Sequence, residues 1–166
     1  MKHMGLILLF SAVVMIGTAY VTRLHERVRL LKAFKLQMQS IKRRFSVSRP
    51  PFTELFSDDD DPLTKPFSQL ICECMKNGAS AKDAVTAAFS SSCVLGFLKK
   101  DEREFLAGIY VSLSLCDIVS ALGTLDNACE ELDSYIEAAA QCERKNAKPV
   151  MSAAVYIGLA AVILLW

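Results

Sequence analysis

The sequence lacks the motifs that would mark a common enzyme family. It has no Walker loop, no G-x-S-x-G and no G-x-G-x-x-G, which excludes nucleotide hydrolysis by a P-loop and the chemistry of the other two motifs. The two histidines, His3 and His25, have no second histidine four residues away, which excludes a metalloprotease helix. Because no nucleophile–base pair is visible either, we expect no catalytic residues and no cofactor.

Metal-binding patterns are missing as well. Cys72-Glu73-Cys74 is C-x-C rather than C-x-x-C, with no histidine nearby, so neither a zinc site nor a redox site is expected. Asp58–Asp61 lacks the alternating ligands and the glycine of an EF-hand loop, and we interpret it as a solvated loop. The six cysteines would form disulfides outside the cytoplasm and stay free thiols inside it. They are Cys72, Cys74, Cys93, Cys116, Cys129 and Cys142.

Two stretches contain no charged residue. Residues 4–22 form a run of 19 and residues 149–166 a run of 18, each roughly 27 Å long as a helix, close to the hydrocarbon thickness of a bilayer. Neither has the polar stripe of a helix that packs in a soluble core. We predict that both are transmembrane helices, and that they form no proton or ion pathway because they contain no charge.

A cleaved signal peptide is the alternative for the first stretch. Lys2 gives it a basic start, and Gly17-Thr18-Ala19 resembles a small-residue cleavage site. The residues that follow favour retention in the membrane, because dense positive charge after an apolar run resists translocation. These residues are Arg23, Arg27, Arg29, Lys32 and Lys35.

The charge distribution predicts the orientation. Residues 1–49 contain ten basic residues and one acidic residue, whereas residues 50–166 contain nine and seventeen. Basic residues follow the first apolar stretch and precede the second, so the positive-inside rule places residues 23–148 in the cytoplasm and both termini outside. This topology explains the basic run without a nucleic-acid partner. The expected contacts with anionic lipid headgroups are Arg23, Arg27, Arg29, Lys145 and Lys148.

The middle region predicts helices, since no stretch alternates polar and apolar residues with a period of two. In its first half we expect a first helix ending at Arg49-Pro50-Pro51, a turn at Phe52–Phe56 and a helix from Pro66 to Asn77-Gly78. A helix over 84–89, capped by Ser80 and Asp83, should follow and end in a break at Ser90–Ser92. The last two expected elements are a helix over 101–111 broken at Ser114–Cys116 and a long helix over 118–146 capped by Asp117. Pro149 should mark the junction with the last membrane helix. The expected fold class is all-α: a cytoplasmic helical bundle (23–148) flanked by an N-terminal (4–22) and a C-terminal (149–166) transmembrane helix.

The long helix offers a candidate partner surface. It carries seven acidic residues from Asp117 onward and no base before Arg144, and this acidic face would either meet the basic first helix or remain solvated. The candidate residues are Asp126, Glu130, Glu131, Asp133 and Glu137. In the last stretch, Ala154 and Gly158 have the spacing of a small-residue pair, which would allow close approach of another membrane helix or would face lipid.

Several short motifs accompany this architecture. They are a basic helix that begins at 26–31 (ERVRLL), the proline Pro51, a turn containing Gly78, a helix that begins at 101–106 (DEREFL), a turn at 113–117 (LSLCD) and a terminal span containing Gly158. Over its full length the chain resembles the stage III sporulation protein AB family of endospore-forming bacteria. That family is similar to one copy of the cytoplasmic domain of the inner-membrane platform proteins of type II secretion and type IV pilus systems. Ser114 stands where the family pattern has glycine, and Ala121 where it has glutamine.

The resemblance implies a role in the channel complex between mother cell and forespore. It implies a platform in the mother-cell membrane around the forespore that docks a cytoplasmic secretion-type ATPase, stage III sporulation protein AA, and contacts other membrane proteins of the channel. Two other classes stay open. One is a two-span membrane adaptor unrelated to sporulation, which would lack a neighbouring secretion-type ATPase gene. The other is a secreted, disulfide-linked factor whose mature chain would start at Tyr20.

Thiol labelling of intact cells tests the predicted topology. With the middle region in the cytoplasm, a membrane-impermeant maleimide should leave Cys93 and Cys129 unmodified until the cells are permeabilised. Permeabilised cells provide the control, because the reagent can then enter the cytoplasm. Modification of either cysteine in intact cells would show that the orientation is inverted.

Overall fold

The computed structural model describes residues 2–47, 51–57, 59–115 and 118–165. Within these residues the chain is helical and has no strand, which confirms the predicted all-α class. The elements are α1 (Lys2–Val47), α2 (Phe52–Ser57), α3 (Lys65–Lys76), α4 (Ala81–Ser91), the 3₁₀ helix η1 (Cys93–Phe97), α5 (Lys100–Leu115) and α6 (Ile118–Leu165). They form two compact units.

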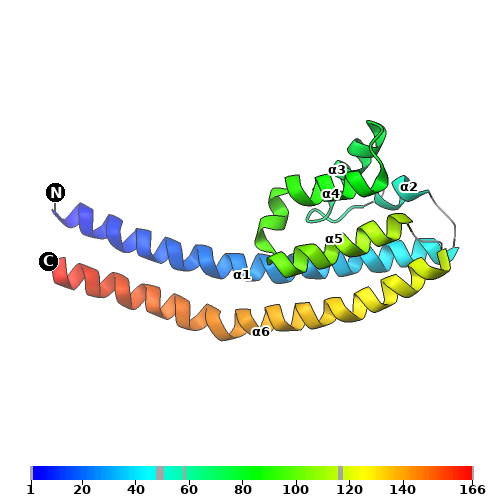
Figure 1. The fold of residues 1–166 in the computed structure, drawn as a ribbon. Helices are drawn as coiled ribbons and strands as arrows, with labels where there is room; N and C mark the ends of the chain where they lie inside the picture. The colour runs from blue at the N-terminus through cyan, green and yellow to red at the C-terminus, as the bar shows by residue number, and fades with distance from the viewer. Residues whose placement is uncertain (1, 48–50, 58, 116–117, 166) are drawn as a thin grey trace. The chain divides into compact units, whose positions relative to one another are not determined.

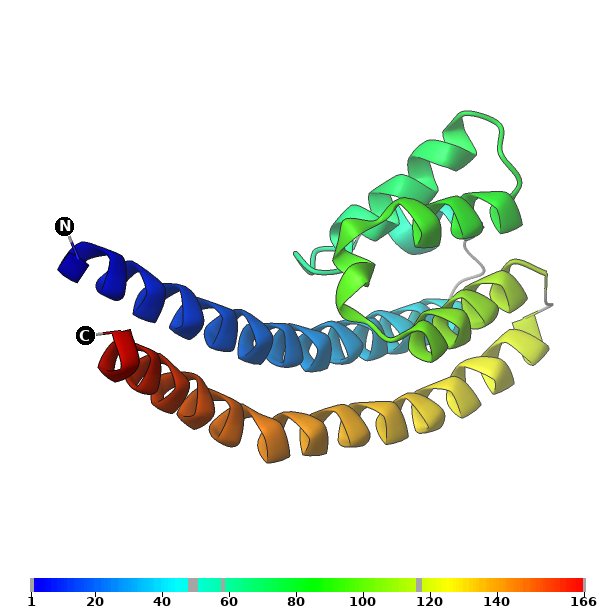
Figure 2. The ribbon, with the colours of Figure 1, turned by 60° about the vertical axis from the view of Figure 1, so that its left-hand side comes forward.

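The terminal unit comprises residues 1–28 and 137–166. It contains the first part of α1 and the last part of α6, which lie side by side and run antiparallel (Figures 1 and 2). Pro149 lies inside α6, so the predicted end of the long helix near Asn146 is wrong. The helix continues through Pro149 even though a proline donates no hydrogen bond to the carbonyl one turn back.

The central unit comprises residues 29–136. The rest of α1, α5 and the first part of α6 run alongside one another, and α2, α3 and α4 lie on one side of this layer (Figures 1 and 2). The core is aromatic: Phe34, Phe67, Phe89 and Tyr110, from four different helices, are buried. The ring centroid of Phe67 lies 4.8 Å from that of Phe89 and 5.4 Å from that of Tyr110. Such contacts add about 0.5–1.5 kcal/mol each to the stabilisation by apolar burial.

A buried glutamine connects these elements through hydrogen bonds. Nε2 of Gln37 donates to Oδ2 of Asp59 (2.8 Å) and to Oγ of Ser68 (2.7 Å), while its Oε1 accepts from the hydroxyl of Tyr110 (2.5 Å). Asp59 also accepts from the hydroxyls of Thr64 (3.0 Å) and Ser68 (2.6 Å). Burial, and then the charge of Asp59, raise the pKa of Tyr110 well above its ordinary value, so its hydroxyl remains a donor. We call these five residues the Gln37 network.

The Gln37 network corrects the prediction of a solvated acidic loop at Asp58–Asp61. Asp58 lies outside the described residues, and Asp60 is exposed as expected. Asp59, however, is only partly exposed, and three side-chain donors from α1, α3 and the turn before α3 satisfy its carboxylate. Buried polar groups are stable when they are paired in this way, so Asp59 holds this turn against the core.

The segment predicted as a turn after Pro51 is the helix α2. The carbonyl of Pro51 accepts a hydrogen bond from the N–H of Glu54 (2.9 Å), and the fixed φ of proline suits the start of a helix. Phe52 and Phe56 lie one turn apart and pack edge to face, with ring centroids separated by 5.1 Å, and Phe56 is buried in the core. Packing therefore stabilises a helix that is too short to form on its own.

Two predicted helix breaks fall where the structure ends a helix: α4 ends at Ser91, within the break predicted at Ser90–Ser92, and α5 ends at Leu115, within the break predicted at Ser114–Cys116. α4 includes Ser90, whose hydroxyl donates to the carbonyl of Thr86 (2.6 Å) and so remains compatible with the helix. α5 likewise runs through Ser114 to Leu115, and the hydroxyl of Ser114 donates one turn back. The predicted cap at Asp117 lies outside the described residues.

The turn between α3 and α4 matches its prediction. Pro66 lies in the first turn of α3, and Gly78 closes that helix with a φ of 87°, a conformation that favours glycine. Oγ of Ser80 accepts from the N–H of Asp83 (3.2 Å), which is the predicted cap of α4. The carboxylate of Asp83 accepts from the Ser80 hydroxyl (2.6 Å). The predicted end of the first helix at residues 49–50 lies outside the described residues.

We expect Tyr110→Phe to lower the free energy of unfolding by about 1–3 kcal/mol, because it leaves the buried Oε1 of Gln37 without its donor. Urea unfolding of the detergent-solubilised full chain, followed by circular dichroism, measures this loss. Tyr135→Phe is the matched control, since the Tyr135 hydroxyl is less buried and has no hydrogen-bond partner among the described residues. Equal losses in both variants would contradict a special role for the Gln37 network.

Candidate membrane and partner surfaces

Two helices are long and apolar enough to cross a membrane. The candidate helices are Ile7–Val47 within α1 and Ser120–Leu164 within α6. Protein buries only 6% of the most apolar 18-residue segment of the first and 11% of that of the second. Large side chains such as Ile16 (71% exposed), Tyr156 (72%) and Ile163 (76%) lack protein cover. Soluble monomers rarely expose apolar surface on this scale, so the two segments are compatible with a membrane protein of two spans.

The two apolar segments meet at glycines. A Cβ added at Gly17 would lie 2.6 Å from Cβ of Ala154, and one added at Gly158 would lie 2.7 Å from Cδ2 of Phe10. Both distances are far below normal contact, so a larger residue would force the helices apart. The predicted small pair, Ala154 and Gly158, thus lies at the contact between α6 and α1 instead of facing outward. The sequence does not predict Gly17 and Phe10 as the partners of this pair, since its only signal at Gly17 is the resemblance of Gly17-Thr18-Ala19 to a cleavage site.

The contact in the terminal unit keeps one register beyond the apolar segments. Nδ1 of His25 lies 2.9 Å from Oε1 of Glu143. From Phe10 to His25 the chain advances by fifteen residues, and from Gly158 to Glu143 it goes back by fifteen. The two helices therefore pair residue for residue in antiparallel order.

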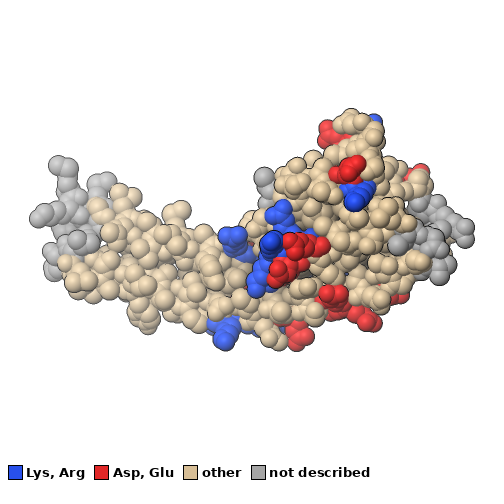
Figure 3. All heavy atoms as spheres, viewed as in Figure 1, with Lys and Arg blue, Asp and Glu red and all other residues tan. Residues whose placement is uncertain are grey.

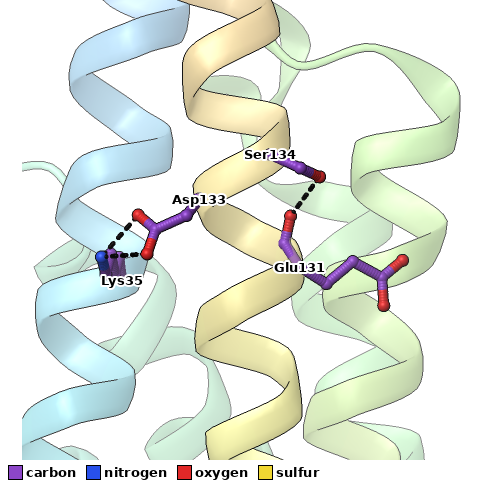
Figure 4. A network of polar contacts seen from close by, with 4 residues as sticks. All are labelled: Lys35, Glu131, Asp133 and Ser134. Carbon is purple, nitrogen blue, oxygen red and sulfur yellow. Dashed lines mark hydrogen bonds and ion pairs between the residues drawn. The ribbon is translucent and has the colours of Figure 1, made fainter.

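The central unit shows the same pairing through lysine and aspartate. Nζ of Lys35 lies 2.5 and 2.6 Å from the carboxylate oxygens of Asp133 (Figure 4), and Lys42 pairs with Asp126. A step of seven residues along α1 matches a step of seven back along α6, which is the spacing of a coiled-coil repeat. The Asp133 and Asp126 side chains remain 57% and 54% exposed, so each pair stabilises the fold by about 1 kcal/mol or less.

The acidic candidates on α6 thus fall into two groups. Asp126 and Asp133 meet the basic first helix, which was one of the two alternatives for this face. Glu130 and Glu131 are exposed, and neither carboxylate has an ion-pair partner within the described part of the chain. The Glu131 side chain points away from Lys35 in Figure 4. Glu137, in the terminal unit, is also exposed, and its Oε1 accepts a weak hydrogen bond from Gln141 (3.4 Å).

The basic candidates lie just past the apolar segments. On the face shown in Figure 3, the apolar part of the terminal unit carries no charged side chain, and Lys and Arg gather where it ends. Arg23, Lys145 and Lys148 of the terminal unit are exposed, and so is Arg29 of the central unit. Arg27 is only 7% exposed. Because protein buries its side chain, the predicted contact of Arg27 with lipid headgroups is not available.

A groove between α2 and α3 was not predicted. Its volume is about 670 Å³, and its lining residues are Thr53, Glu54, Phe56, Ser57, Gln69, Cys72, Glu73 and Lys76. The sequence does not predict this groove, because its pattern predicts a turn at Phe52–Phe56 and the groove needs a second helix as its wall. The Cys72 thiol donates to the carbonyl of Thr53 (3.7 Å), and burial raises its pKa, so it stays protonated at neutral pH and is a poor nucleophile.

Comparison with known proteins identifies one family. The family model described as stage III sporulation protein AB matches residues 2–166, which is essentially the whole chain and confirms the resemblance found in the sequence. No curated protein and no solved structure gave a significant match.

Charge reversal tests the pairing of α1 with α6. Asp133→Lys should lower the free energy of unfolding by about 1 kcal/mol, because it places two ammonium groups side by side. Adding Lys35→Glu to the same chain should restore most of this loss, which a double-mutant cycle on urea unfolding measures. The exposed Glu130→Lys is the control. A cycle in which the two reversals simply add would contradict the pairing.

Proposed function

The chain belongs to the stage III sporulation protein AB family and therefore has a sporulation-related role, and we propose that it acts as a membrane platform of the channel complex between mother cell and forespore. In this proposal α1 and α6 each cross the mother-cell membrane once. The central unit faces the cytoplasm, where it docks the secretion-type ATPase of the system, stage III sporulation protein AA. Other membrane proteins of the channel would contact the outer faces of the two spans.

The distribution of positive charge supports this orientation. Arg23 follows the first apolar segment and Lys148 precedes the second, and both are exposed. Positive charge close to a membrane span keeps its flank in the cytoplasm. The same exposed side chains would contact anionic headgroups at the inner surface. In the cytoplasm the cysteines stay reduced.

The proposed role requires no catalysis. Among the described residues, no three His, Cys, Asp or Glu side chains lie close enough together to hold a metal ion. Burial raises the pKa of the Cys72 and Cys129 thiols, so neither is an activated nucleophile. These features favour a scaffold, and the proposal assigns all the chemistry to the ATPase.

The observation that carries the docking proposal is the unpaired acidic charge on α6. Asp126 and Asp133 are already neutralised by lysines of α1, whereas Glu130 and Glu131 point to solvent without an ion-pair partner among the described residues. A partner that brings basic side chains to this position would find two carboxylates whose charge is not used by the fold. Such surface charge mainly sets the association rate and the choice of partner.

Glu130→Lys combined with Glu131→Lys should weaken capture of the ATPase by about tenfold, because like charges would then face each other across the contact. The measurement is co-purification of the tagged full chain and the ATPase from detergent-solubilised membranes. Asp133 is left unchanged, because its reversal would disturb the fold itself.

Asp60→Lys combined with Glu104→Lys is the matched control, since it makes the same change of charge at exposed positions outside α6. Recovery of the ATPase should be unchanged in this control. Undiminished capture by the α6 variant, with an unaltered circular dichroism spectrum, would reject this docking surface.

A further inference from the structure

The groove between α2 and α3 is built to receive an apolar side chain. Its volume, about 670 Å³, lies within the range of pockets that bind ligands. Phe56 and Cys72 supply apolar lining, and Cys72 is a neutral thiol for the reasons given above. Glu54 and Glu73 are exposed beside it, against a single exposed cation, Lys76. An occupant should therefore combine a bulky apolar group with positive charge.

The corner between η1 and α5 of the same central unit has these properties. Phe97, the last residue of η1, is 39% exposed, although the other core rings of this unit are buried. Lys99 and Lys100 follow it, and both are exposed. Lys99 has no ion-pair partner among the described residues, and Lys100 only a loose one, 3.7 Å from Glu104 with both side chains more than two-thirds exposed. Both ammonium groups are therefore available to another carboxylate.

We propose that the groove between α2 and α3 receives the Phe97–Lys100 corner of a second copy of this chain. In this contact Phe97 enters the groove beside Phe56 and Cys72, and Lys99 and Lys100 approach Glu54 and Glu73. Both halves of the match occur on one chain but on different elements. Two copies can therefore exchange the contact reciprocally in a two-fold dimer, or each copy can bind the next one head to tail, which builds a closed ring or an open chain of subunits.

The groove contains a natural reporter, because Cys72 forms part of its lining. Two full-length chains with different tags are produced together in membranes. One carries Phe97→Cys and Cys72→Ser, and the other is unchanged. Copper phenanthroline at pH 8.5 oxidises two neighbouring thiols to a disulfide and takes up the two electrons, and the alkaline pH increases the thiolate fraction of Cys72, whose pKa is raised by burial. The expected product is a disulfide-linked dimer that contains both tags.

Two controls isolate the proposed contact. Cys72→Ser in both chains should abolish the dimer, because the other cysteines are not in the groove. Asn127→Cys in place of Phe97→Cys should give no dimer, because Asn127 is exposed on α6 and belongs neither to the groove nor to this corner. A dimer that survives Cys72→Ser, or no dimer although both chains are recovered from the membrane, would overturn the proposal. So would capture of a different protein by Cys72.

A charge exchange keeps the proposal testable if Phe97→Cys does not fold. Glu54→Lys with Glu73→Lys in both tagged chains should reduce their co-purification by about tenfold, because every groove then meets a corner of like charge. Adding Lys99→Glu with Lys100→Glu to both chains should restore it. Failure of the second pair to restore association would reject the assignment, whatever the outcome of the ATPase experiment, which concerns residues of α6.

Discussion

The antiparallel pairing of α1 with α6 is the contact on which the rest of the structure depends. In the terminal unit it is made by glycines, since Gly17 and Gly158 let the apolar helices approach without a Cβ between them. In the central unit it is made by lysines and aspartates at the surface. Such exposed pairs add little stability. Their main effect is to favour one register over its neighbours, because a shift of α6 by one residue in either direction would bring Lys35 and Lys42 opposite uncharged side chains.

Stability and specificity come from different parts of the central unit. The aromatic core buries large apolar surface and supplies most of the favourable free energy, but rings can pack in several ways. The Gln37 network is directional. The side-chain amide of Gln37 donates to Asp59 and Ser68 and accepts from Tyr110, and hydrogen bonds weaken steeply when their angles are distorted. A competing arrangement of the helices would leave these polar groups buried without partners, at a cost of about 1–3 kcal/mol each. The network thus restricts the core to one arrangement.

Much of this architecture could be predicted from the sequence. The two uncharged runs, the turn at Gly78 and the cap at Ser80 follow from local rules about length, glycine and serine. The errors arose where tertiary contacts decide the outcome. Phe56 makes a helix of α2 only because a core lies beneath it, and donors from α1 and α3 hold Asp59 against the core. Local patterns predict local structure, whereas Phe56 and Asp59 respond to neighbours that are distant in sequence.

The candidate surfaces were harder to predict for a related reason. A run of acidic residues on α6 predicts negative charge but not which carboxylates the fold uses. Only the register separates Asp126 and Asp133, which face lysines, from Glu130 and Glu131, which do not. Arg27 was misjudged in the same way, since its burial is set by the packing around it. The groove between α2 and α3 has no linear signature at all.

The constant register of α1 and α6 also constrains how the length of this chain can change. One residue inserted between Lys35 and Lys42 would rotate Lys42 by about 100° around the helix axis, away from Asp126. A deletion at the facing position of α6 would not undo this rotation, because it turns the second helix as well. Insertions and deletions can therefore be accommodated in the connections between helices, whereas within the paired parts of α1 and α6 only multiples of seven residues, matched on both helices, would preserve the contacts.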